Sequence, residues 1–73
     1  MKLTDILDVL DVIYEYTTFI SVSDIINDVN KPIDLVKEIL LRLEELSIIK
    51  KENDKYINNM TYTEAYDVIL KMN

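Results

Sequence analysis

The first sixteen residues mix apolar and acidic side chains at the spacing of an amphipathic helix. At 3.6 residues per turn, one stripe of this segment is apolar and is expected to face a core; it consists of Leu3, Ile6, Leu7, Leu10, Ile13 and Tyr14. Thr4 is a plausible N-cap, so the pattern predicts a helix over residues 4–16. A second face is acidic, with Asp5, Asp8, Asp11 and Glu15. A third, roughly opposite the core stripe, carries Val9, Val12 and Tyr16.

A short extended segment and a short helix follow. Residues 17–20 are β-branched and aromatic, which predicts one extended bridge rather than a full strand. Ser21 then fits the N-cap of a helix over residues 22–30. Asn30 tolerates the left-handed backbone that ends many helices, so we expect this helix to stop there.

The third predicted helix spans residues 32–46 and starts at Pro32, a residue that fits the first helical position. Its expected core stripe is apolar, with Ile33, Val36, Ile39, Leu40, Leu43 and Leu46. Its expected outward face is mostly charged, with Asp34, Lys37, Glu38, Leu41, Arg42 and Glu45. The helix therefore presents both signs of charge to solvent.

The last part of the chain predicts a hairpin and a final helix. Residues 48–58 form two short strand patterns around an Asn53-Asp54 turn. Thr61 and Glu64 have the spacing of a capping box, which opens a helix over residues 62–72. This helix is apolar over more than half of its circumference.

The chain has 73 residues and no glycine, so its turns must be made by Asn, Asp, Ser and Pro. No linker or repeat divides it, and we expect one domain over residues 1–73. The fold class is mostly α with a small β-hairpin, in the order α-(β)-α-α-β-β-α. Such a short chain buries only about 60% of its unfolded surface, so it gains stability from packing against a partner.

Composition excludes several kinds of chemistry. Without His or Cys, the chain has no imidazole base, no thiolate nucleophile and no structural zinc site. Because it also lacks a glycine-rich phosphate loop, we expect neither an enzyme nor a bound cofactor or metal. No apolar run is long enough to span a bilayer, and acids interrupt the N-terminal apolar stretch. We therefore expect a cytoplasmic protein with no signal peptide and no membrane contact.

The run from Ile20 to Asn58, ISVSDIINDVNKPIDLVKEILLRLEELSIIKKENDKYIN, resembles the helix-turn-helix and wing of winged-helix domains. It has a capped second helix, a turn, a third helix with the pattern V-x-x-x-L-x-x-L, an apolar pair and a basic hairpin. The resemblance covers about half of the chain, and the flanking helices fit the small dimeric regulators of prokaryotes and their viruses. One departure is Ser47, at a position that is often glycine in the family.

The resemblance implies DNA binding, with the third helix in the major groove and the hairpin against the backbone. The net charge of −6 opposes this, but it is unevenly distributed. Residues 1–30 carry one base and six acids, whereas residues 31–55 carry six of each. The expected contacts with double-stranded DNA are Lys31, Lys37, Leu41, Arg42, Lys50, Lys51, Lys55 and Tyr56.

Each of these features also has a structural interpretation. Lys37 and Arg42 also fit a solvated helix face with nearby acidic partners, and the hairpin lysines fit protection of a sheet edge. The acidic face of the first helix resembles a metal site or a mimic of nucleic-acid charge, but a solvated face is the simpler interpretation. Of the five tyrosines, only Tyr56 is placed for contact with nucleic acid.

The terminal helices carry more apolar surface than one small core is expected to cover. Either these helices pack on each other within one chain, or they form a symmetric homodimer, which we favour. The expected dimer interface contains Val9, Val12, Tyr16, Tyr62, Tyr66, Ile69 and Met72.

Three classes of function follow from these patterns. The first is a homodimeric winged-helix DNA-binding protein that regulates transcription. The second is a winged-helix module that binds a protein component of a transcription, replication or membrane-remodelling complex without binding DNA. The third, an enzyme, has little support because the available side chains and the short chain offer no substantial cleft. We favour the first.

Overall fold

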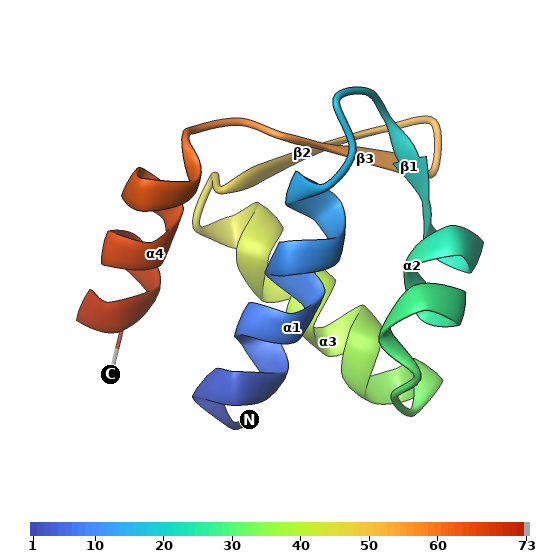
Figure 1. The fold of residues 1–73 in the computed structure, drawn as a ribbon, viewed down its shortest axis with the longest axis horizontal. Helices are drawn as coiled ribbons and strands as arrows, with labels where there is room; N and C mark the ends of the chain where they lie inside the picture. Colours follow the sequence, from blue (N-terminus) through green and yellow to red (C-terminus); the bar gives the residue numbers. More distant parts are fainter. Residues whose placement is uncertain (73) are drawn as a thin grey trace.

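The computed structural model describes residues 1–72 as four helices and one three-stranded antiparallel sheet (Figure 1). In chain order the elements are α1 (Leu3–Tyr14), β1 (Ile20–Ser21), α2 (Val22–Val29), α3 (Ile33–Glu45), β2 (Ile49–Glu52), β3 (Lys55–Asn58) and α4 (Tyr62–Lys71). The expectation of a mostly helical fold with a β-hairpin is confirmed. Within residues 1–72, no helix combines the length and the apolar character needed to cross a bilayer.

Three of the expected helix ends are confirmed by their hydrogen bonds or backbone angles. The Ser21 hydroxyl accepts the Asp24 backbone N–H at 3.2 Å, which caps α2. Asn30 ends α2 in the left-handed conformation, with φ 52°. Thr61 and Glu64 form the reciprocal capping box that starts α4. These ends are set by local sequence, which is why a single chain reveals them.

Other helix ends differ from expectation. The N-cap of α1 is Lys2 rather than Thr4, because the Asp5 and Ile6 backbone N–H groups donate to the Lys2 carbonyl. The helix ends at Tyr14 rather than Tyr16. Pro32 is the N-cap of α3 and not its first helical residue, since its ψ of 138° is extended.

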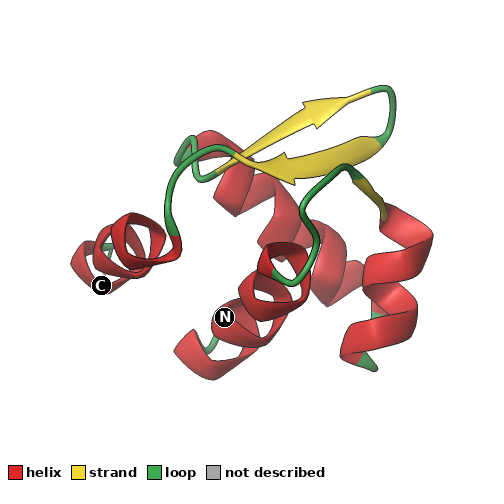
Figure 2. Cartoon of the chain, turned by 45° about the horizontal axis from the view of Figure 1, so that its top comes forward, coloured by secondary structure: helices red, strands yellow, loops and turns green. Residues whose placement is uncertain are grey.

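The sheet has the strand order β1-β3-β2, with both pairs antiparallel (Figure 2). The extended bridge lies at Ile20–Ser21, slightly later than the expected residues 17–20, because Ile20 pairs with Tyr56 of β3. Asn53 and Asp54 have φ of 51° and 65°, as a two-residue type I′ hairpin turn requires. The expected Asn-Asp turn is therefore confirmed.

Ser47 makes the joint between α3 and the hairpin. It has φ 62°, and its N–H donates to the Glu44 carbonyl at 2.9 Å while the Ile48 N–H donates to the Leu43 carbonyl at 3.0 Å. These two bonds form a Schellman motif, the helix ending in which glycine is usual at the left-handed position. Serine thus adopts the left-handed backbone that usually favours glycine.

In Figure 1, α1 lies between α4 on one side and α2 on the other, and it contributes five side chains to the core. Because other elements pack against α1 from more than one side, the face with Val9 and Val12 is buried as well as the expected core stripe: Val9 is 0% and Val12 is 9% exposed. Ile69 of α4 is also fully buried. This corrects the expectation of an unpartnered apolar face on the first helix, and these three side chains belong to the core of one chain rather than to a dimer interface.

Candidate binding face on α3 and the hairpin

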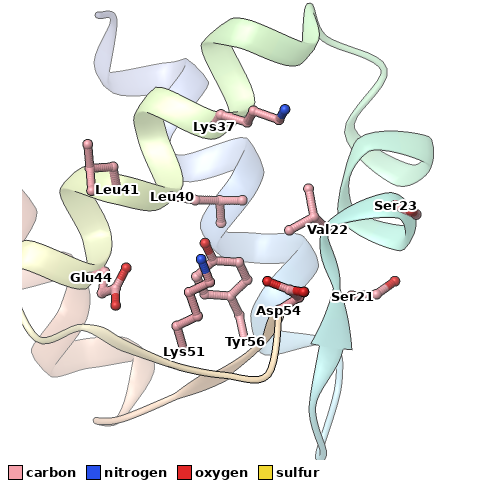
Figure 3. A pocket seen from close by; sticks show the side chains of 10 residues that line it. All are labelled: Ser21, Val22, Ser23, Lys37, Leu40, Leu41, Glu44, Lys51, Asp54 and Tyr56. Carbon is pink, nitrogen blue, oxygen red and sulfur yellow. The ribbon is translucent and has the colours of Figure 1, made fainter.

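The start of α2, the outward face of α3 and the hairpin enclose an open groove of about 630 Å³ (Figure 3). The α3 wall is formed by Lys37, Leu40, Leu41 and Glu44. The hairpin wall is formed by Lys51, Asp54 and Tyr56, and the α2 end by Ser21, Val22 and Ser23. The groove therefore brings together four of the residues expected to contact DNA, which are Lys37, Leu41, Lys51 and Tyr56.

The three hairpin lysines lie on two faces of the sheet. Lys51 pairs with Tyr56 across β2 and β3, and both side chains face α3. Successive side chains of a strand point to opposite faces, so Lys50 and Lys55 point away from the helices. Lys55 lines a smaller hollow at the hairpin turn beside Phe19. The hairpin thus presents one lysine to the groove and two to the outer surface.

Tyr56 does not offer a face on which a nucleic-acid base can stack. Its side chain is only 6% exposed, and the Lys51 Nζ lies 6.0 Å from the centre of its ring. Burial is the main cause that raises the pKa of its hydroxyl. The expectation of base contact at Tyr56 is corrected by this burial, because pairing with Ile20 draws the residue into the core.

Lys31 is held by α1 rather than presented to solvent. Its Nζ lies 2.7 Å from Asp5 Oδ1 and 3.1 Å from Asp8 Oδ2, and its side chain is 17% exposed. The hydrogen bond with Lys31 lowers the pKa of Asp5, and the same contact with Asp5 raises the pKa of Lys31. We therefore exclude Lys31 from the candidate binding face.

The acidic face of α1 was expected to be solvated, but three of its carboxylates have partners within the chain. Asp5 and Asp8 both bind Lys31, while Asp11 Oδ1 accepts the Tyr62 hydroxyl at 2.7 Å. These partners come from distant parts of the chain, so the sequence pattern of α1 alone does not reveal them. In the described part of the chain, no group of three or more Asp or Glu side chains is arranged to hold a metal ion.

The remaining cations of α3 and the hairpin have no carboxylate partner. Among residues 1–72, ion pairs within 4.0 Å involve only Lys31 and the surface pair Lys71–Asp67. The cations outside these pairs on the candidate face are Lys37, Arg42, Lys50, Lys51 and Lys55. The acidic partners expected for Lys37 and Arg42 along α3 are therefore not engaged within this distance.

Arg42 is the one α3 cation outside the groove. It follows Lys37 by five residues, which places it about 140° further around the helix. The same face of α3 as Lys37 carries two exposed apolar side chains: Ile33 is 52% and Leu41 is 59% exposed. The expectation that Ile33 belongs to the core stripe is wrong, because this residue lies in the first turn of α3, at the edge of the packed region.

A second surface lies on α4, where Tyr62, Tyr66 and Leu70 follow one another at four-residue spacing. They are 40%, 38% and 44% exposed. The ring centres of Tyr62 and Tyr66 lie 6.4 Å apart in a stacked arrangement. Those of Tyr62 and Tyr14 lie 5.6 Å apart, with the two rings nearly perpendicular. Of the other residues expected in a dimer interface, Met72 packs partly against the core. Tyr16 is half-buried, and its hydroxyl donates a hydrogen bond to Asp28 Oδ2 at 3.2 Å.

Comparison with known proteins adds no family to this picture. No protein-family model, curated protein or solved structure matches the chain. The proposed function therefore rests on the sequence pattern and on the geometry of α3, the hairpin and α4.

Proposed function

We propose that this chain is a winged-helix DNA-binding protein that acts as a homodimer in the regulation of transcription. The element order α1-β1-α2-α3-β2-β3-α4 supports the proposal, since it is the order expected from the sequence resemblance. In this arrangement α3 is the helix that enters the major groove. The β2–β3 hairpin is the wing, and its outer lysines meet the DNA backbone.

The unpaired cations are the observation that carries the proposal. Neutralising phosphates with Lys and Arg supplies most of the affinity of a protein for non-specific DNA. A cation that is already paired has less to gain from a phosphate. Of the three cations away from the candidate face, Lys31 and Lys71 are paired and Lys2 is not, whereas none of the five cations of α3 and the hairpin is paired among residues 1–72. The charge that remains available is therefore concentrated where the proposed interface lies.

A second candidate function is a winged-helix module that binds a protein. The exposed side chains of Ile33 and Leu41 on α3 favour it, because an apolar pair beside mixed charges suits a protein surface. Under this alternative the chain does not bind duplex DNA even at low salt. Leu41→Asp then abolishes capture of the partner.

Charge reversal tests the DNA-binding proposal. We expect the double variant Lys51→Glu with Lys55→Glu to lose binding to a random-sequence duplex, measured by fluorescence anisotropy at low salt. The matched control is Lys2→Glu with Lys71→Glu, which changes the net charge equally but away from the candidate face. The control is expected to keep most of the affinity. Equal losses in both variants would show that net charge alone governs binding, and would contradict the proposed interface.

A further inference from the structure

The outward face of α3 carries its cations at the edges and its carboxylates at the centre. At about 100° per residue, the side chains that point most directly away from the buried stripe of α3 are Asp34, Glu38, Leu41 and Glu45, and all four are exposed. Lys37 and Arg42 lie about 70° to either side of this centre. The middle of the helix proposed to contact DNA is therefore acidic and apolar rather than basic.

This arrangement limits which parts of a duplex the centre of α3 can contact favourably. Phosphates repel carboxylates, so an acidic side chain in the major groove needs a hydrogen-bond donor on a base edge. The donors there are the N4 amine of cytosine and the N6 amine of adenine. Adenine also presents its N7 acceptor beside the amine, which repels a carboxylate, whereas cytosine presents no acceptor of its own. A carboxylate at the centre of α3 therefore favours cytosine.

Glu38 is the central carboxylate whose position the helix itself does not explain. Asp34 lies in the first turn of α3, where an acidic side chain stabilises the helix N-terminus. Glu45 is the last residue of the helix, next to the turn into the hairpin. Glu38 lies in the middle of α3, and among residues 1–72 no cation lies within 4.0 Å of its carboxylate, not even Arg42 one turn further on. Leu41, three residues after Glu38, is 59% exposed on the same face.

We propose that Glu38 and Leu41 determine which bases α3 prefers, an inference that rests on the proposed function. The Glu38 carboxylate accepts a hydrogen bond from a cytosine N4 amine, and the Leu41 side chain contacts the methyl group of a thymine in a neighbouring base pair. Three residues rise about 4.5 Å along a helix, which is close to the spacing of about 3.4 Å between successive bases of one strand. The two side chains therefore fit neighbouring base pairs.

Selection from a library of randomised duplexes tests the preference of the full chain at low salt. We expect sequencing of the bound duplexes to show an enriched cytosine beside a thymine. In the enriched duplex, replacement of the cytosine should lower the affinity about tenfold, as expected for one hydrogen bond to a charged acceptor. Replacement of the thymine by deoxyuridine, which lacks only the methyl group, should lower it about two- to fourfold.

Two variants assign these preferences to their side chains. Glu38→Gln is expected to change the preferred base from cytosine to adenine, because an amide both donates to N7 and accepts from N6. Leu41→Ala should bind the thymine and deoxyuridine duplexes equally. The matched control is Glu15→Gln, which removes the same charge from an exposed position after α1 and should retain the preference for cytosine. Circular dichroism of each variant reports whether it is folded.

The possible failures are distinguishable. Duplex binding without an enriched cytosine, or the same base preference in the wild-type and Glu38→Gln chains, would overturn the inference and leave the proposed DNA binding intact. A change of preference in the Glu15→Gln chain would assign the effect to net charge and would also overturn it. If no duplex binds at low salt, both the proposed function and the roles of Glu38 and Leu41 are wrong.

Discussion

Tyr62 shows how a single side chain joins distant parts of the chain. Its hydroxyl donates to Asp11 of α1 at 2.7 Å while its ring lies between Tyr14 and Tyr66. The contact ties the start of α4 to the last turn of α1. The acidic residue that looked like part of a solvated face in the sequence is therefore an anchor for the last helix.

This contact makes a prediction about alkaline pH. The hydrogen bond to the Asp11 carboxylate raises the pKa of Tyr62 from 10.0 to about 12. Because the folded-state pKa lies above the ordinary one, the contribution of Tyr62 to stability is complete below pH 10.0 and is lost as the pH rises to about 12. Tyrosine-ring ¹³C NMR across this range measures the pKa, and Tyr62→Phe assigns the signal.

Asp11→Asn is the matched change for this prediction. It keeps the shape of the side chain and removes the negative charge, so the pKa of Tyr62 should fall toward its ordinary value. An unchanged Tyr62 titration in the Asp11→Asn chain would show that the hydrogen bond to this carboxylate is not the cause of the shift.

At the scale of elements, the end of α3 contains a residue in a disfavoured backbone conformation, which lowers the stability of the fold. Ser47 occupies the left-handed position of a Schellman motif, at φ 62°, where a residue with a Cβ is disfavoured by about 1–2 kcal/mol relative to glycine. The motif is nonetheless complete, since both of its backbone hydrogen bonds are present. The Asn59 side chain also donates to the Ser47 carbonyl at 3.1 Å, which ties the end of β3 to this turn.

We predict that Ser47→Gly raises the free energy of unfolding by about 0.5–1 kcal/mol, because it relieves this strain and keeps the backbone bonds. Ser47→Ala retains the Cβ and should be less stable than Ser47→Gly by about 1 kcal/mol. Urea denaturation followed by circular dichroism measures both. If the alanine chain equals or exceeds the glycine chain in stability, the left-handed backbone at this position is not strained.

The elements themselves were largely predictable because their signals are local. Ser21, the Thr61–Glu64 pair and the Asn53-Asp54 turn each act within a few residues, and each has its expected role. Burial was less predictable, because it depends on what packs against an element from elsewhere. The sequence could not show that Val9 and Val12 face other parts of the same chain.

The candidate site was predictable only in part for the same reason. The position of α3 and the hairpin followed from periodicity, and three of the residues expected to contact DNA, Lys37, Leu41 and Lys51, line the groove. Lys31 and Tyr56 were misjudged, since an ion pair to α1 and a strand pair with Ile20 draw them inward. The contribution of α2 to the groove was missed, although the bridge before Ser21 was a signal that β1 and α2 lie beside the hairpin.

At the scale of the whole molecule, the exposed stripe of α4 supports the proposed homodimer. Tyr62, Tyr66 and Leu70 lie on one line of the helix and remain more than one third exposed. The helix has Glu64 in its first turn and Lys71 in its last. At about 100° per residue both lie on the face opposite the stripe, so the surface that two copies would pack together about a twofold axis is itself uncharged. A 73-residue chain also has more to gain from such burial than a larger domain.

We predict that Tyr66→Asp or Leu70→Asp produces a monomer, because a carboxylate on this stripe would be desolvated at the interface. Leu41→Asp is the control, since it places the same charge on an exposed apolar position of α3 and should leave the dimer intact. Light scattering at high micromolar concentration measures the mass of each chain. A wild-type chain that is monomeric under these conditions would contradict the dimer.

DNA binding through the unpaired cations is the central claim, and the salt dependence of binding tests it most directly. Arg42 lies about 140° from Lys37 around α3 and is therefore not counted as a phosphate contact. If Lys37, Lys50, Lys51 and Lys55 each neutralise one phosphate, the logarithm of the affinity for a random duplex should fall with the logarithm of salt concentration with a slope of about −3 to −4 per chain. Lys51→Gln should make that slope shallower by about one. Absence of binding at low salt, or a slope near zero, would contradict the claim.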